Sequence, residues 1–143
     1  MAKRGKWRIK EAVKIAEEAG LKALRTGAEA ILTEAIDETP FESGTLRRSG
    51  TVTVGGLPDG ARVFEAAEAG NEMKDAFSDP VGKEKSVYIS FNTPYARRQH
   101  EELDYNHPRG GKAKYLEDPF NRLKQKVVKM AELRIKKALK DAP

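Results

Sequence analysis

The chain has 143 residues, enough for one domain, and 34% of them are charged while only 7% are aromatic. It contains no cysteine, which excludes disulfides and thiolate metal sites, and no apolar run approaches the ~20 residues that span a bilayer. The net charge of +5 favours an acidic partner, either DNA or an acidic protein surface, although a solvated helix face would account for it equally. No signal-peptide core follows the basic N-terminal residues, so we expect a protein made in a cytoplasm.

Residues 6–37 predict a long first helix. Apolar residues recur there at spacings of three and four and form one stripe: Ile9, Val13, Ala16, Leu24, Ala28, Ile31 and Ala35. Gly20 and Gly27 are costly inside a helix, so we expect a bend or division at Gly20, or the close approach of another backbone along these small residues. Thr39-Pro40 ends the helix, because the residue before proline avoids the helical conformation.

The middle of the chain, residues 50–92, predicts strands and loops. Before it, we expect a turn in which Ser43 caps, Gly44 relaxes the backbone and Leu46 points inward. Alternating residues and intervening turn formers predict three strands, at 51–54, 61–65 and 86–92. Between the second and third strands, residues 66–85 form a long excursion that has either a loop or a short helix near 72–77.

The last third of the chain predicts two more helices. Thr93, as N-cap, and Pro94 start a short helix over 94–102, and a final helix runs over 119–140. We expect Leu46, Leu116 and Phe120 in the core. The pattern predicts a single α+β domain, residues 1–143, in which a small, mostly antiparallel sheet packs with long N-terminal and C-terminal helices.

The residues offer little support for catalysis or for a metal site. His100 and His107 are the only histidines, and no serine lies in a Gly-x-Ser-x-Gly elbow, so we predict no enzyme. His100, Glu101, Asp104 and His107 offer metal ligands, but their spacing matches no zinc pattern. We expect these four to be polar groups of a loop and a helix end, and we predict neither a metal nor a cofactor.

Arginine and tyrosine side chains favour a role in protein contacts, because they combine large area with directed hydrogen bonds. The predicted interface residues are Arg47, Arg48, Tyr95, Arg97, Arg98, His100, Tyr105, His107 and Arg109. For Tyr95, packing onto the core is an equal alternative to exposure. The same arginines, with Lys112 and Lys114, would also serve sequence-independent contact with DNA phosphates, since no base-reading motif is present.

Two blocks of the sequence, Thr39-Pro-Phe-Glu-Ser-Gly-Thr-Leu-Arg-Arg-Ser49 and Thr93-Pro-Tyr-Ala-Arg97, carry a family resemblance. They resemble the tailed-phage minor capsid or neck proteins, which join the DNA-filled head to the tail. Tyr115-Leu-Glu-Asp-Pro119 resembles the start of that family's closing helix. The resemblance spans roughly Thr39 to Phe120, and the 66–85 excursion and the strongly basic C-terminal helix depart from the family pattern.

The resemblance implies a structural virion protein without catalysis or cofactor. It implies a homo-oligomeric ring, hexameric or dodecameric, at the head–tail junction. Neighbouring connector or stopper proteins and tail terminator or tail tube proteins would be its partners, with non-specific contact to DNA in the channel. The residues leave one alternative from another class, a small basic protein that binds DNA without sequence preference.

Overall fold

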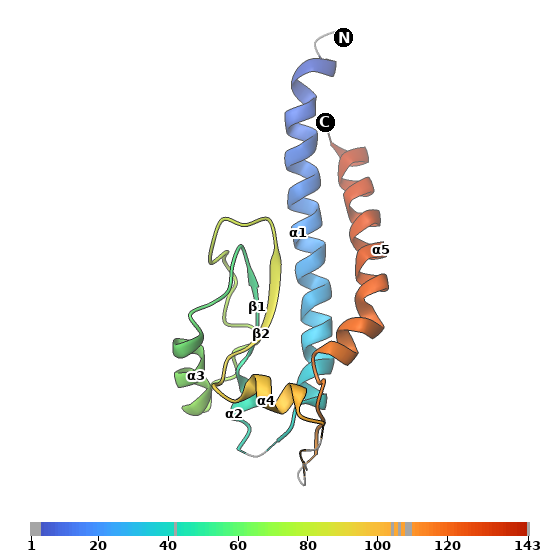
Figure 1. Cartoon of the computed structure of the whole chain (residues 1–143). Helices are drawn as coiled ribbons and strands as arrows, with labels where there is room; N and C mark the ends of the chain where they lie inside the picture. Colours follow the sequence, from blue (N-terminus) through green and yellow to red (C-terminus); the bar gives the residue numbers. More distant parts are fainter. Residues whose placement is uncertain (1–3, 42, 104, 106, 108–109, 143) are drawn as a thin grey trace.

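The computed structural model describes residues 4–41, 43–103, 105, 107 and 110–142. Its elements, in chain order, are α1 (Arg4–Glu38), α2 (Thr45–Arg48), β1 (Gly50–Val54), α3 (Gly60–Glu68), β2 (Val87–Phe91), α4 (Ala96–Glu101) and α5 (Glu117–Asp141). The two long helices, α1 and α5, lie side by side and antiparallel, and the sheet with the short helices lies beside the C-terminal half of α1 (Figure 1). This arrangement confirms the predicted α+β class and the two long helices that begin and end the fold.

Small residues on α1 let α5 approach closely. A Cβ atom built on Gly27 would lie only 2.5 Å from Cγ1 of Val127, and one on Gly20 would lie 3.3 Å from Cδ1 of Ile135. Helix α1 continues without division at either glycine, and what approaches both of them is a side chain of α5. Because α1 has 35 residues and α5 has 25, the N-terminal end of α1 extends beyond the end of α5 (Figure 1).

We expect Gly27→Ala to destabilise the fold by about 1–2 kcal/mol, although alanine is the better helix former. The reason is the clash with Val127, whose β-branched side chain has little rotamer freedom. Chemical denaturation of a double-mutant cycle with Val127→Ala checks this, because the shorter side chain should remove most of the added cost. An equal cost of Gly27→Ala in both backgrounds would contradict a clash at this site.

The sheet has two antiparallel strands, with Gly50 paired to Phe91 and Val54 paired to Val87. Val52 packs into a core cluster with Ala28 and Leu32 of α1. The strand also buries two polar side chains that find partners. The Thr51 hydroxyl lies 2.8 Å from Oγ of Ser90, and the Thr53 hydroxyl donates to the Gly56 carbonyl at 2.7 Å. The predicted first and third strands are therefore confirmed, and the sheet is held against α1.

The strand predicted at 61–65 is wrong, because these residues belong to helix α3. The Asp59 side chain caps this helix by accepting a hydrogen bond from the Arg62 backbone amide. Val63 and Ala67, four residues apart, are both buried and define the helix face that packs inward. Residues 61–65 alternate as a strand does, but this stretch is too short to include Ala67, which forms the helical i, i+4 pair with Val63. The short stretch therefore predicted strand periodicity where the structure has a helix.

The excursion between α3 and β2 contains no helix near 72–77, where the structure has turns and bends. Its middle is anchored at two points. The Met73 backbone amide donates to the Arg48 carbonyl at 2.9 Å. The Arg25 guanidinium of α1 donates to the carbonyls of Phe77 and Ser78, at 2.7 and 2.6 Å. The loop alternative of the sequence prediction is thus the correct one.

Three local predictions also need correction. Helix α4 begins at Ala96 and not at Pro94, so Thr93 is not its N-cap. Gly44, with φ at 86°, is the N-cap residue of α2, so Ser43 lies one residue before it, although Oγ of Ser43 still accepts from the Thr45 backbone amide at 3.5 Å. Phe120 is 47% exposed and so is not a core residue, because it lies on the side of α5 that faces an open groove. Leu46, by contrast, is buried as predicted.

Candidate protein-interaction surface

Helix α4 presents two arginines to solvent while its first residue is buried. Arg97 and Arg98 are exposed, and neither side chain makes a hydrogen bond or ion pair to the described part of the chain. Ala96 is buried, and its carbonyl accepts a hydrogen bond of 2.8 Å from the hydroxyl of Tyr115. Tyr95 is 37% exposed, between the two alternatives that the sequence left open. The core contact thus fixes the helix and leaves its two arginines available.

Arg47 and Arg48 make their contacts within the chain. Nε of Arg47 donates to the Thr39 carbonyl at 2.9 Å, and its guanidinium lies over the Phe41 ring. Nε of Arg48 donates to the Ala67 carbonyl at the end of α3, also at 2.9 Å. Both residues are half-buried. They brace the corner between α1 and β1, so the part they can offer to a partner is smaller than the sequence indicated.

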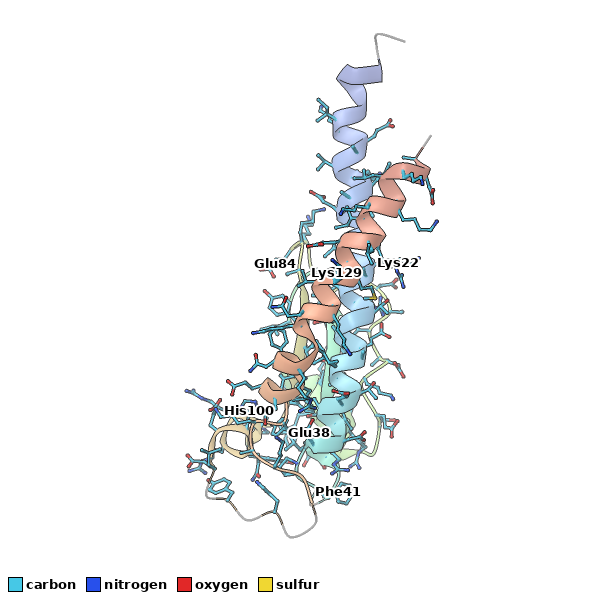
Figure 2. The ribbon with its side chains drawn as sticks, turned by 90° about the vertical axis from the view of Figure 1, so that its right-hand side faces the viewer. Lys22, Glu38, Phe41, Glu84, His100 and Lys129 are labelled. Atoms are coloured by element: carbon cyan, nitrogen blue, oxygen red, sulfur yellow. The ribbon has the colours of Figure 1, made fainter. Side chains whose placement is uncertain are left out.

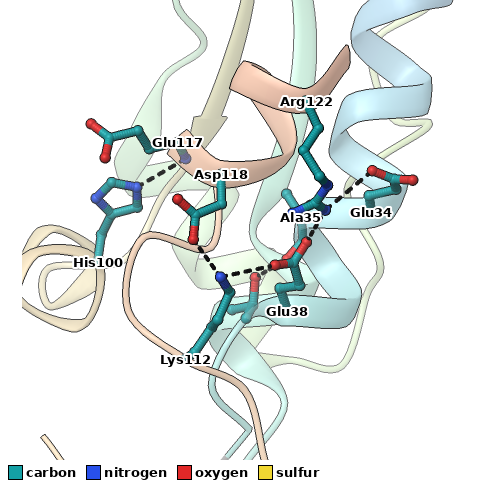
Figure 3. Close-up of polar contacts among 9 residues, drawn as sticks. Glu34, Ala35, Glu38, His100, Lys112, Glu117, Asp118 and Arg122 are labelled. Atoms are coloured by element: carbon teal, nitrogen blue, oxygen red, sulfur yellow. Dashed lines mark hydrogen bonds and ion pairs between the residues drawn. The ribbon is translucent and has the colours of Figure 1, made fainter. Parts of the chain in front are cut away.

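His100 connects α4 to the start of α5 and to the core. Its Nε2 accepts a hydrogen bond of 3.2 Å from the Glu117 backbone amide (Figure 3). Its Nδ1 therefore carries the proton and donates to Glu101 at 3.0 Å. The imidazole packs edge-on against the Tyr115 ring, with 5.0 Å between centroids. These contacts give His100 a positioning role at the edge of the predicted interface.

The remaining predicted residues follow α4 in the chain. Tyr105 is 39% exposed. His107 is half-buried, and its carbonyl accepts from the Gly110 amide at 3.0 Å, while its Nε2 has no hydrogen-bond partner in the described chain. Arg109 lies outside the described residues. The structure therefore brings Tyr95, Arg97, Arg98 and His100 together on and beside α4 and places Arg47 and Arg48 elsewhere.

An apolar groove of about 410 Å³ opens between α1, β2 and α5. His100 and Glu117 are its polar members. The full lining is Leu24, Ala28, Ile31, Val87, Tyr88, Ile89, His100, Leu116, Glu117, Phe120 and Val127. The apolar stripe of the first helix is the only signal of this groove in the sequence, and it does not by itself predict a groove. Periodicity predicts which residues face inward, but it does not show that α5 and the sheet leave part of that stripe uncovered.

A cluster of ion pairs fixes the loop before α5 to the end of α1 (Figure 3). Nζ of Lys112 lies 3.4 Å from Glu38 and also pairs with Asp118. Arg122 pairs with Glu38 and lies 3.3 Å from Glu34. A hydrogen bond from Arg122 lowers the pKa of the Glu38 carboxyl, and one from Lys112 lowers the pKa of Asp118. Lys112 is thus engaged within the chain and is a poor candidate for DNA contact.

This cluster predicts a loss of stability in acid. The depressed pKa values of Glu38 and Asp118 mean that their contacts stabilise the fold above the ordinary values of 4.5 and 3.8. That stabilisation disappears as the pH falls through the lower values of the folded state. We expect Glu38→Gln to be less stable than the unmodified chain at neutral pH and equally stable in acid. Urea unfolding across this range checks it, with Glu11→Gln as the control for removing one carboxylate that has no ion pair among the described residues.

The acid-rich segment around His100 does not converge into a metal site. No three histidine, aspartate or glutamate side chains are grouped suitably for a metal within the residues that the structure describes, and Asp104 of the predicted set lies outside them. Among the described helices, none is long and apolar enough to cross a membrane. What the arrangement offers is an apolar groove that reaches His100 of α4, and an exposed pair of arginines on the same helix, which suits contact with another macromolecule.

Comparison with known proteins finds no relative. The sequence matches no protein-family model, and no curated protein or solved structure is significantly similar to it.

Proposed function

We propose that this protein is a structural subunit of the head–tail junction of a tailed phage, where a ring of copies joins the DNA-filled capsid to the tail. The observation that carries the proposal is that several large apolar side chains of the long helices are exposed to solvent. Its exposed large apolar side chains on the long helices include Ile9, Val13, Phe120, Val128, Leu133 and Leu139. Exposed apolar surface of this kind marks protein contacts.

The N-terminal end of α1 shows this most clearly. Ile9 is 66% exposed and Val13 is 52% exposed. They continue, at spacings of four and three, the stripe that passes through Gly20 and Gly27 and packs on α5. At this end α1 extends beyond the end of α5 (Figure 1). In a ring, a neighbouring subunit would cover this stretch, and many weak contacts of this kind together give a strong assembly.

The two sequence blocks that resemble neck proteins have structural tasks in this chain. In the first block, the Thr39 hydroxyl donates to the Ala35 carbonyl at 2.6 Å, and Ser49 Oγ accepts from the Asn92 amide at 3.0 Å. In the second, Ala96 receives the Tyr115 hydroxyl. These contacts give both blocks a structural role, which is what a subunit that acts by assembly requires. The virion is accordingly the proposed location, with connector and tail proteins as partners.

The test is to interrupt this gene with a stop codon in the phage that carries it and to examine the lysate by negative-stain microscopy. We expect full heads lying apart from finished tails, and the unmodified gene supplied in trans should restore joined virions. Intact virions without the gene product would reject a joining role.

One observation favours the second candidate, a sequence-independent DNA-binding protein. The side chains of Lys126, Lys129, Arg134, Lys136 and Lys140 on α5 are exposed and have no ion pair within the described chain. A DNA-binding protein would lose affinity for duplex DNA steeply as salt rises, because each phosphate contact releases counterions. Fluorescence titration of a duplex at several salt concentrations separates the two candidates, since the junction role requires no such affinity before assembly.

A further inference from the structure

The charges of this protein are separated into two faces. Between Lys124 and Lys140, seven basic residues of α5 stand against one acidic residue, Glu132. Between Glu65 and Asp79, five acidic residues stand against one basic residue, Lys74. The five acidic residues are Glu65, Glu68, Glu72, Asp75 and Asp79, and all are exposed without an ion pair to the described chain. We call these two surfaces the basic face and the acidic face.

The two faces lie on opposite sides of α1. Gly27 of α1 packs against Val127 of the basic helix. Arg25, two residues earlier and therefore about half a turn away, holds the carbonyls of the acidic excursion. Figure 1 shows α3 and α5 on opposite sides of α1, and in Figure 2 α5, with Lys129, lies in front while α3 lies behind. A single copy therefore cannot bring its own faces together.

Each face also has an apolar component. On the basic face, Leu133 is 57% exposed and lies with Met130 in a shallow hollow edged by lysine and arginine side chains. Beside the acidic face, a hollow of about 290 Å³ is lined by the apolar residues Ile36, Phe41 and Met73, with Glu72 and the basic residues Arg47, Arg48 and Lys74 among its members. An apolar centre inside a polar rim is the usual composition of a protein interface.

We infer that the basic face of one copy docks on the acidic face of the next, which makes the contact between copies head-to-tail. This inference rests on the proposed ring and names its subunit contact. A second copy is the occupant because it supplies the complement of both faces at once, whereas DNA would satisfy the basic face and be repelled by the acidic one. A contact between two different faces leaves both outer faces open, so it propagates to further copies and forms a ring when the rotation closes.

The test weakens each face separately. Variant K129E/R134E lowers the net charge of the basic face from +6 to +2, and variant E72K/D75K neutralises the acidic face, whose net charge is −4. Sedimentation velocity at low ionic strength should show the unmodified chain above its monomer mass of 15.9 kDa and each variant at that mass. A mixture of the two variants in equal amounts should associate again, because each then meets a complementary face on the other.

The variant with all four substitutions is the matched control, since it has the net charge of the unmodified chain but no pair of complementary faces, and it should stay monomeric. Circular dichroism checks that each variant is folded. A second measurement needs no substitution. When ¹⁵N-labelled and unlabelled copies are mixed and treated with a carbodiimide, lysines of α5 in one copy should become crosslinked to acidic side chains between positions 65 and 79 in another.

Three results would overturn the inference: an unmodified chain that stays monomeric at low ionic strength, a double variant that associates normally alone, or a mixture that fails to associate. A monomeric chain whose duplex DNA binding is lost in K129E/R134E would make DNA the partner of the basic face. If the chain associates as expected but virions remain intact when its gene is interrupted, only the junction role is rejected.

Discussion

Replacing Tyr115 by alanine should lower the free energy of unfolding by about 4 kcal/mol, the usual cost of deleting a buried aromatic side chain. Tyr115 is 1% exposed, and its ring lies edge-on between Phe91 of β2 and His100 of α4, at 5.0 Å from each. Its hydroxyl holds the Ala96 carbonyl. One side chain thus joins the sheet to α4 and to the segment that leads into α5, so its loss leaves a cavity at their junction.

Tyr115→Phe is the matched control, because it keeps the ring and removes only the hydroxyl. It should cost about 1–2 kcal/mol, the penalty for leaving the Ala96 carbonyl without its buried partner. Urea unfolding gives both values, and amide chemical shifts of Arg97 and Arg98 report whether α4 has moved. Equal costs for the two variants would show that the ring contributes no packing, which would contradict this account.

The second large effect is expected at Gly55, just after β1. Its φ is 88°, and a Cβ atom there would lie 2.1 Å from the Gly82 carbonyl oxygen, which belongs to the backbone and cannot rotate away. Gly55→Ala combines the cost of left-handed backbone, about 1–2 kcal/mol, with this clash. We expect a total of at least ~3 kcal/mol and a detached excursion, because the Glu84 amide also bonds to the Gly55 carbonyl.

Gly70→Ala separates the two contributions. Gly70 has a φ of 101°, but nothing lies within 4 Å of its Cβ position. Its substitution should therefore cost only the backbone term, about 1–2 kcal/mol. Thermal and urea unfolding of both variants measure the difference. If Gly55→Ala proved no more costly than Gly70→Ala, the excursion would not approach β1 as closely as the structure shows.

Both predictions bear on the proposed assembly, because they concern how the fold holds its surfaces. Tyr115 positions α4, whose arginines are exposed, and Gly55 positions the acidic excursion. Arg48 adds a third connection, since its carbonyl accepts from Met73 and its guanidinium holds the end of α3. A surface built from short elements needs such connections to present a constant shape to a neighbouring subunit.

The interface prediction shows how far residue type alone can lead. Arginine and tyrosine are common at protein contacts, so Arg47, Arg48, Arg97 and Arg98 are all predicted from the sequence to belong to one interface. Arg97 and Arg98 do face solvent, whereas Arg47 and Arg48 find carbonyl partners at Thr39 and Ala67 within the chain. Nothing local distinguishes the two pairs, because the partner of Arg48 lies nineteen residues away.

The long helices, strands β1 and β2 and the α+β class can be predicted from the sequence, because periodicity and end signals are local and extend over many residues. The remaining features depend on how the chain packs. Residues 60–68 became a helix once Val63 and Ala67 had a surface to pack on, and Lys112 became a structural cation once Glu38 and Asp118 surrounded it. The separation of charge onto opposite sides of α1 is likewise a property of the packed chain, since it arises from contacts between residues far apart in sequence.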